Sequence, residues 1–206
     1  MTASLIGVRV PTAGTGAGAV WLVRHAPTAW TGSRWCGRSD PALSDEGRQV
    51  ASETADALAA ELPARVAILS SPLRRARATA EAIAARVGGS VELIAELAEV
   101  DFGRIEGHTW GELSTRDPGL AAAILADSPV DWPGGETASE VADRAARAAA
   151  LVRARGATSA VVVVSHGRFL RALEGPLAGG AVSSAAEHLA PGGVIRVRFA
   201  GREGNG

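Results

Sequence analysis

Short runs of hydrophobic residues alternate along this chain with longer segments in which hydrophobic residues recur at helical spacing. The short runs are typical of buried strands and cover residues 19–23, 66–69, 91–94, 161–164 and 194–199. The longer segments predict helices over residues 45–62, 72–87, 110–116, 120–125, 138–155 and 167–174. Because strands and helices alternate, the sequence predicts an α/β fold built on a layered sheet.

Polar residues and prolines mark where several of the predicted helices begin and end. Ser44 can cap the first helix, which Pro63 ends. Ser71 followed by Pro72 is typical of an N-cap with proline at the first helical position, and Thr137 can cap the long alanine-rich helix. The second helix is therefore expected to begin at Pro72.

The N-terminal segment differs from the rest of the chain. Its stretch PTAGTGAG (residues 11–18) is rich in glycine and has few bulky side chains, so we expect residues 1–18 to form a flexible tail with at most a short edge strand at residues 5–10. After it, the chain shows no internal repeat and no break in composition. Residues 19–206 are therefore expected to form a single domain.

The composition excludes several classes of protein. The 206 residues include 22 acidic and 21 basic side chains, a formal net charge of −1, which fits neither a disordered polyelectrolyte nor a basic nucleic-acid binder. All 21 basic residues are arginines, which excludes a P-loop lysine and a Schiff-base lysine. A small molecule or another protein is the expected partner.

Cysteine content and hydropathy indicate where in the cell the protein is expected. The single cysteine, Cys36, cannot form an internal disulfide, and no apolar run approaches the roughly 20 residues of a membrane span. The first residues lack the basic opening and apolar stretch of a signal peptide. We therefore expect a cytoplasmic protein without membrane partners.

Residues able to bind an anion follow three of the predicted strands. The first strand leads to Arg24 and His25, the second to Arg74 and Arg75, and the strand of valines to His166. In sheets of this kind, ligands bind at the C-terminal ends of the strands, so these side chains are expected to converge there. Guanidinium groups match phosphate oxygens and a neutral imidazole can attack phosphorus, so the sequence predicts a phosphate site.

Six segments carry a resemblance to a known family. They are LVRHAPTAW (residues 22–30), DPALSDEGR (40–48), SSPLRRARATA (70–80), ELAEVDFGRIEG (96–107), PGGET (133–137) and VVSHG (163–167). In order and spacing they resemble the motifs of the histidine phosphatase superfamily, in its phosphoglycerate mutase-like branch, over about residues 19–175. The resemblance implies a three-layer α/β/α sandwich with a mostly parallel central sheet.

The resemblance also implies a role for each matched residue. His25 would be the nucleophile that forms a phosphohistidine, which water then hydrolyses. Arg24, Arg75 and His166 would surround the transferred phosphoryl group and neutralise its charge. Glu99 would protonate the leaving oxygen and later activate water.

Two further residues accompany this set. Thr28 would add a hydroxyl contact to the substrate, and Asp101 is the alternative to the glutamate as proton donor. No metal ion or other cofactor is implied, because the arginines supply the charge that a metal supplies elsewhere.

The sequence departs from the family pattern at two positions. Ala26 replaces the usual glycine after the histidine, a change that the backbone tolerates if its φ is negative. Cys36 stands where many members have glutamine, and no CX5R arrangement surrounds it, so a cysteine phosphatase is not indicated.

Simpler interpretations stay open for some of these residues. Arg75 also fits a solvated helix face, and Glu99 lies in an acidic loop of the kind that is usually solvated. Trp30, Trp35 and Trp132 either line the pocket or close the edge of the core.

Three functions remain possible. The first is a phosphomonoesterase acting on a small phosphorylated metabolite, and the second is a cofactor-dependent phosphoglycerate mutase, which uses the same residues but returns the phosphate to its substrate. The family's mutases have a longer insertion than residues 107–133 provide, so the phosphatase is favoured. The third is a non-catalytic domain that binds a phosphorylated ligand, which predicts the loss of a core residue, although all are present.

Two features bear on the substrate and on assembly. An arginine at the rim of the pocket would favour a substrate with a second anionic group, and the candidates are Arg34, Arg38, Arg104 and Arg168. The apolar strand predicted at residues 194–199 lies at an edge where a homodimer can form.

Overall fold

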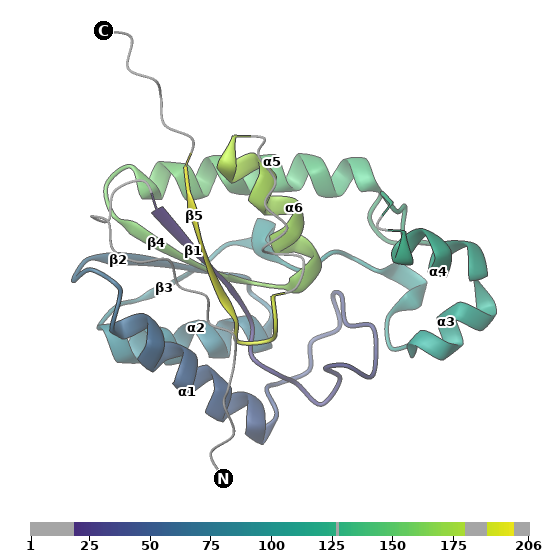
Figure 1. The fold of residues 1–206 in the computed structure, drawn as a ribbon, viewed down its shortest axis with the longest axis horizontal. Coiled ribbons are helices and arrows are strands. Elements are labelled where there is room, and N and C mark those ends of the chain that lie inside the picture. Colours follow the sequence, from purple (N-terminus) through teal and green to yellow (C-terminus); the bar gives the residue numbers. More distant parts are fainter. Residues whose placement is uncertain (1–18, 127, 180–188, 200–206) are drawn as a thin grey trace, which may run out of the picture.

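A five-stranded sheet forms the centre of the molecule (Figure 1). The computed structural model describes residues 19–126, 128–179 and 189–199. In chain order the strands are β1 (Ala19–Arg24), β2 (Val66–Ser70), β3 (Val91–Leu93), β4 (Ala160–Ser165) and β5 (Val194–Arg198). In space their order is β3-β2-β4-β1-β5, with β5 antiparallel to β1 and the other neighbours parallel. The prediction of a mostly parallel sheet is confirmed.

Helices cover both faces of this sheet and make three layers. The helices α1 (Asp45–Ala59) and α2 (Arg74–Val87) lie on one face, and α5 (Ala138–Gly156) and α6 (Gly167–Ala178) lie on the other (Figure 1). Strands β1 and β4 are therefore buried from both sides, which explains why they are continuous apolar runs. Along β4 the side chains alternate, so Val161 and Val163 face α5 and α6 while Val162 and Val164 face α1 and α2.

A smaller hydrophobic cluster lies beside the sheet and carries two short helices, α3 (Trp110–Arg116) and α4 (Pro118–Leu125), at the right of Figure 1. Two 3₁₀ turns, η1 (Ala95–Leu97) and η2 (Gly103–Ile105), lead into it from β3. We call it the satellite cluster, and its buried residues are Val100, Phe102, Ile105, Leu113, Ala121 and Trp132. It is separate from the two clusters that flank the sheet.

Strand register brings the ends of three strands together. The β1–β4 ladder pairs Arg24 with Ser165, and the His25 amide continues it by donating to the Ser165 carbonyl at 2.9 Å. On the other side of β4, the Ser71 amide donates to the Val164 carbonyl at 3.0 Å. The residues that follow β1, β2 and β4 therefore meet at one edge of the sheet.

Several helix boundaries differ from the prediction, among them those of α1, α2 and α6. Helix α1 ends at Ala59, because residues 60–62 form a turn that still places Leu62 against the core. Helix α2 begins at Arg74, since Leu73 is extended and no side chain caps the helix, so the expected start at Pro72 was wrong. Helix α6 continues to Ala178, with Pro176 inside its last turns.

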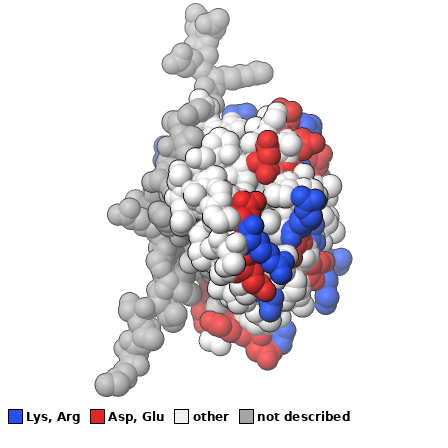
Figure 2. Space-filling model, turned by 90° about the vertical axis from the view of Figure 1, so that its right-hand side faces the viewer, with Lys and Arg blue, Asp and Glu red and all other residues white. Residues whose placement is uncertain are grey.

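The visible surface carries charges of both signs. On the face shown in Figure 2, acidic and basic side chains are interspersed and lie next to an uncharged area. Among the described residues, no helix combines the length and hydropathy that crossing a bilayer requires. The tail expected at residues 1–18 and the strand at residues 5–10 lie outside the described part of the chain.

Candidate active site

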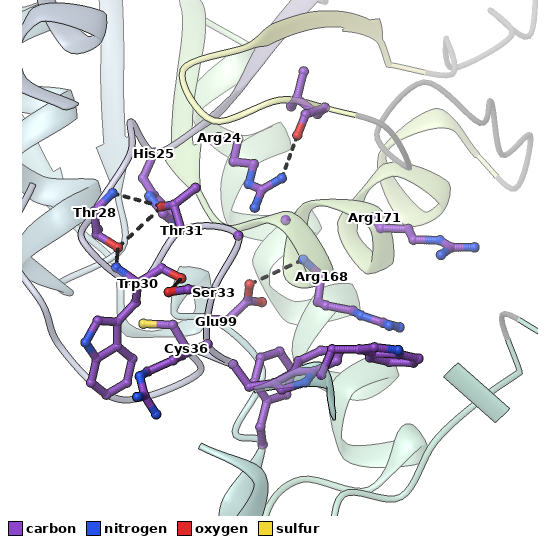
Figure 3. A pocket seen from close by; sticks show the side chains of 17 residues that line it. Arg24, His25, Thr28, Trp30, Thr31, Ser33, Cys36, Glu99, Arg168 and Arg171 are labelled. Atoms are coloured by element: carbon purple, nitrogen blue, oxygen red, sulfur yellow. Dashed lines mark hydrogen bonds between the residues drawn. The ribbon is translucent and has the colours of Figure 1, made fainter. Parts of the chain in front are cut away.

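A cavity of about 430 Å³ opens where β1 and β4 end (Figure 3). Four residues of the predicted site line it, namely Arg24, His25, Thr28 and Glu99. Arg75 and His166 do not line it, because both are completely buried, but each contacts the ring of His25. The structure therefore brings all six predicted residues together at one cavity and the histidine beside it.

The ring of His25 is held in one tautomer. Its Nδ1 lies 2.7 Å from the carbonyl oxygen of Ala26, which can only accept, so Nδ1 carries the proton. The other nitrogen, Nε2, then has a free electron pair and accepts a hydrogen bond from Nε of Arg75 at 3.3 Å. Burial, with the positive charge of Arg75 next, lowers the pKa of His25 to about 3. The imidazole is therefore neutral at physiological pH, with Nε2 able to act as a nucleophile.

Arg75 is oriented by backbone carbonyl groups. Its terminal nitrogens donate to the carbonyl oxygens of Ser39 at 2.7 Å, Gly37 at 2.8 Å and Cys36 at 3.3 Å. These neutral acceptors hold the guanidinium without cancelling its charge, and the nearest carboxylate oxygen, on Asp40, is 4.0 Å away. The interpretation of Arg75 as part of a solvated helix face was wrong, since the side chain is fully buried.

His166 stands against His25, with the two ring centres 5.0 Å apart. Its Nε2 lies 2.8 Å from the hydroxyl oxygen of Ser71, which also accepts a bond from the Leu73 amide. Among the described residues, its Nδ1 has no hydrogen-bond partner. Burial, followed by the charge of Arg75, lowers the pKa of His166 well below its usual range, so this ring is neutral too. Ser71 therefore serves the site rather than capping α2 as predicted.

Arg24 points into the cavity from the end of β1 (Figure 3). One terminal nitrogen donates to the carbonyl oxygen of Leu189 at 2.9 Å, and its Nε has no partner among the described residues. The guanidinium also approaches Gly167, where an added Cβ would lie 3.3 Å from it. Donors of Arg24 are thus available to an anion next to His25.

Glu99 is bound by backbone amides at the start of α6. Its Oε1 accepts from the amides of Val100 and Phe169, both at 2.9 Å, while Oε2 accepts only a long bond of 3.3 Å from the Arg168 amide. Oε2 is therefore the less engaged of the two carboxylate oxygens. Asp101 does not line the cavity, and its Oδ1 accepts from the Gly103 amide, so Glu99 is the better placed of the two carboxylates.

Two smaller side chains of the site have local partners. Thr28 accepts a hydrogen bond from the Trp30 amide at 3.2 Å and lies beside Thr31 in Figure 3. The Cys36 thiol lines the cavity, and burial raises its pKa, so it stays protonated at neutral pH. Neither geometry nor ionisation makes this thiol a nucleophile.

Only two of the four arginines expected at the rim line the cavity. Arg34 and Arg168 line it, as does Arg171, which the sequence analysis did not select. Arg38 and Arg104 do not line it, and Arg38 instead lies 3.6 Å from Glu136.

The aromatic residues divide between the two interpretations that the sequence left open. Trp30 and Trp35 line the cavity, together with Trp110, whereas Trp132 is buried in the satellite cluster. Trp110 is a lining residue that the sequence analysis did not identify. Trp110 is the first residue of α3, and nothing in the sequence around it indicates that it would line a binding cavity.

One functional feature could not be read from the sequence. The carboxylate of Glu106 accepts hydrogen bonds from the amides of Arg38 and Ser39, both at 2.6 Å, and from the Ser39 hydroxyl. It thereby fixes the loop whose carbonyl groups orient Arg75. We call this loop and its acceptors the Arg75 cage (residues 36–39).

The electrostatics of the cavity favour anions. Four arginines line it (Arg24, Arg34, Arg168 and Arg171), against one carboxylate, Glu99, among the described residues. The described residues contain no group of three or more histidine, cysteine or acidic side chains arranged to hold a metal ion.

Comparison with known proteins agrees with this geometry. The model of the histidine phosphatase superfamily, branch 1, matches residues 20–205, and the chain belongs to this family. A bifunctional protein of Mycobacterium tuberculosis is 38% identical over 149 residues, a match that covers 70% of this chain and 40% of that relative. The chain thus spans less than half the length of this relative.

Two other relatives match over more of their length. A glucosyl-3-phosphoglycerate phosphatase of Mycolicibacterium vanbaalenii is 37% identical over 166 residues, which cover 77% of this chain and 73% of the relative. The solved structure of a mycobacterial glucosyl-3-phosphoglycerate phosphatase in complex with VO3 has a TM-score of 0.76 and 29% identity, covering 87% of this chain and 90% of the other. The predicted family and fold are confirmed.

Proposed function

We propose that this protein hydrolyses phosphate monoesters of small metabolites through a phosphohistidine on His25, without a metal ion. The observation that carries the proposal is the state of His25: a neutral ring at the cavity wall whose Nδ1–H donates to a carbonyl and whose unprotonated Nε2 accepts from Arg75. Relatives of this chain that bear the name of a phosphatase support the same reaction.

The first half of the reaction transfers the phosphoryl group to His25. The Nε2 lone pair attacks phosphorus, and the bond between phosphorus and the alcohol oxygen breaks. The proton on Oε2 of Glu99 passes to that oxygen, so the alcohol leaves neutral. Oε2 is suited to this step because Oε1 already accepts two amide bonds.

Four cationic or polar groups stabilise the charge that develops on the phosphoryl oxygens. Arg75 donates its Nε–H to Nε2 in the free protein and would give it to a phosphoryl oxygen once Nε2 is bonded to phosphorus. Arg24 offers its unpaired Nε from the β1 side, and His166 stands 5.0 Å from the His25 ring. Thr28 adds a hydroxyl at the cavity wall.

The second half returns His25 to its starting state. Water attacks phosphorus, the phosphorus–nitrogen bond breaks, and the Glu99 carboxylate accepts the proton that water loses. The products are inorganic phosphate and the regenerated imidazole. The arginines supply positive charge on the phosphoryl oxygens throughout, which is the contribution that a metal ion makes in other phosphotransfer sites.

Phosphate release from a panel of monoesters in the presence of EDTA tests the proposal. We expect release by the wild type, loss of release in His25→Ala, and full release in His108→Ala, whose half-exposed histidine lies outside the cavity. Brief reaction with a radioactive ester should give an acid-labile, alkali-stable label on the wild type alone.

Other outcomes would favour the alternative functions. Transfer between phosphoglycerates primed by 2,3-bisphosphoglycerate, without net release, would identify a mutase, and silence in both assays would favour a phosphate-binding domain. A cytoplasmic location, a homodimer and the organisation of residues 19–206 as one domain stay predictions.

A further inference from the structure

Arg168 places its guanidinium group beside a pair of adjacent tryptophan rings at the wall of the cavity. The guanidinium carbon lies 5.8 Å from the centre of the Trp35 ring and 5.6 Å from that of Trp132. These contacts are in the range of cation–π interactions and restrict an otherwise flexible side chain. In Figure 3 the side chain of Arg168 points away from His25.

In the described part of the chain, no carboxylate lies within ion-pair distance of this guanidinium. Among the described residues, Arg168 forms no ion pair, and the nearby Glu99 carboxylate is bound to backbone amides instead. The side chain is half-buried, and burial lowers its pKa. Without an ion pair, this partly desolvated guanidinium gains only the longer-range attraction of Glu99, and it is stabilised further when an anion binds to it.

The position of Arg168 relative to Glu99 shows which part of a substrate would reach it. Oε2 of Glu99, the oxygen that would protonate the leaving alcohol, is bonded to the Arg168 amide at 3.3 Å. The transferred phosphoryl group would lie on the other side, at His25 and Arg24. Arg168 therefore lies on the side of the leaving alcohol.

The other lining arginines are less suited to this role. Arg34 is exposed, and its terminal nitrogen donates to the Gly107 carbonyl at 2.6 Å. Water screens a charge at such a position. Arg171 lines the cavity one turn further along α6, where it adds to the positive potential near Arg168.

We propose that Arg168 binds a second anionic group, a carboxylate or a phosphate, carried by the alcohol part of the substrate. The inference rests on the proposed phosphatase function and assigns the substrate class for that site. The planar fork of Arg168 would give two parallel hydrogen bonds to such a group, and the two indoles would hold the fork in place.

Three esters of the same length test this proposal. Glycerol 3-phosphate has a neutral tail, 3-phosphoglycerate has a carboxylate tail, and glycerol 1,3-bisphosphate has a phosphate tail. We expect the wild type to favour one or both anionic esters over glycerol 3-phosphate by about tenfold or more in kcat/KM, as for a charge-assisted hydrogen bond. The preferred tail identifies the second anion as carboxylate or phosphate.

Variants at Arg168 show whether this residue provides the preference. In Arg168→Gln we expect the ratio of kcat/KM for the anionic ester to that for glycerol 3-phosphate to fall towards one. Arg168→Lys should keep part of the ratio, since it retains the charge but not the planar fork. Arg104→Gln is the matched control, because Arg104 is an exposed arginine that does not line the cavity, and its ratio should stay unchanged.

A binding experiment separates this proposal from the catalytic one. Titration of the three esters into the His25→Asn variant, followed by tryptophan fluorescence, measures the preference without turnover. If the wild type releases no phosphate but this preference exists and disappears with Arg168→Gln, the proposed reaction fails and the anion site stands. Equal affinity for all three esters, or an equal loss for all three in Arg168→Gln, would overturn the anion site.

Discussion

The substitution Glu106→Gln tests whether the Arg75 cage controls the reaction from outside the cavity. Oε1 of Glu106 accepts from the Arg38 amide, and Oε2 accepts from the amide and the hydroxyl of Ser39. Glutamine has the same shape but a single acceptor oxygen. One of the two amides must therefore face an NH2 group, which is also a donor.

The magnitude follows from the bonds that are lost. A hydrogen bond to a charged group contributes about 1.5–3 kcal/mol. At the exposed Arg38 amide, water can form a replacement hydrogen bond and recover part of this energy. We expect Glu106→Gln to lower the free energy of unfolding by about 1–2 kcal/mol. The freed loop no longer holds the Gly37 and Ser39 carbonyls in place, so Arg75 loses its orientation, and kcat/KM should fall by about 10- to 100-fold.

Urea unfolding and steady-state phosphate release measure the two effects. The matched control is Glu112→Gln, because Glu112 also accepts a backbone hydrogen bond, from Thr109 at 2.7 Å, but lies outside the cavity and the cage. This control should keep its kcat/KM. If Glu106→Gln lost stability while kcat/KM stayed at the wild-type value, the argument that this carboxylate orients Arg75 would be refuted.

Three further predictions concern the neutral histidines and the close packing of the site. Because the folded pKa values of His25 (about 3) and His166 lie below the unfolded value near 6.5, only the unfolded chain gains these protons below that pH. For each of the two histidines, the free energy of unfolding should then fall by up to about 1.4 kcal/mol per pH unit as the pH decreases. Urea unfolding measured at several pH values should show that this free energy depends less steeply on pH in His25→Gln than in the wild type. Ser71→Ala removes the partner of His166 Nε2, so kcat/KM should fall about tenfold in steady-state assays, and an unchanged value would contradict its positioning role. In Gly135→Ala the new Cβ would lie 2.2 Å from the Asp101 carbonyl oxygen, so thermal unfolding should show a Tm lowered by more than about 4 °C, whereas an unchanged Tm would mean that the turn adapts freely.

The strands and the residues at their ends could be predicted because their signals are local. The valines of β4 form a continuous apolar run, as a strand buried on both faces requires, and His25 and His166 follow such runs directly. Parallel register at the centre of the sheet then brings the two rings together without further information.

The cage and the start of α2 could not be predicted, because they depend on tertiary contacts. Ser71 and Pro72 carry the local pattern of a helix start, but the Ser71 hydroxyl is bound to His166, a residue 95 positions away. Likewise, backbone carbonyl groups have no sequence signature, so nothing in the sequence indicates that a loop would enclose Arg75. The contribution of Glu106 depends on the same fold, since its partners lie 67 and 68 residues earlier.

The separate core of the satellite cluster makes the molecule modular. The wall that carries Trp35 and Phe102 belongs to this cluster, whereas His25 and His166 are anchored in the sheet and its own cores. Substitutions in α3 and α4 can therefore reshape the side of the cavity that receives the alcohol without disturbing the strands that hold the histidines. Changes in α3 and α4 can thus accommodate a different leaving group while His25 and His166 keep their places at the ends of the strands.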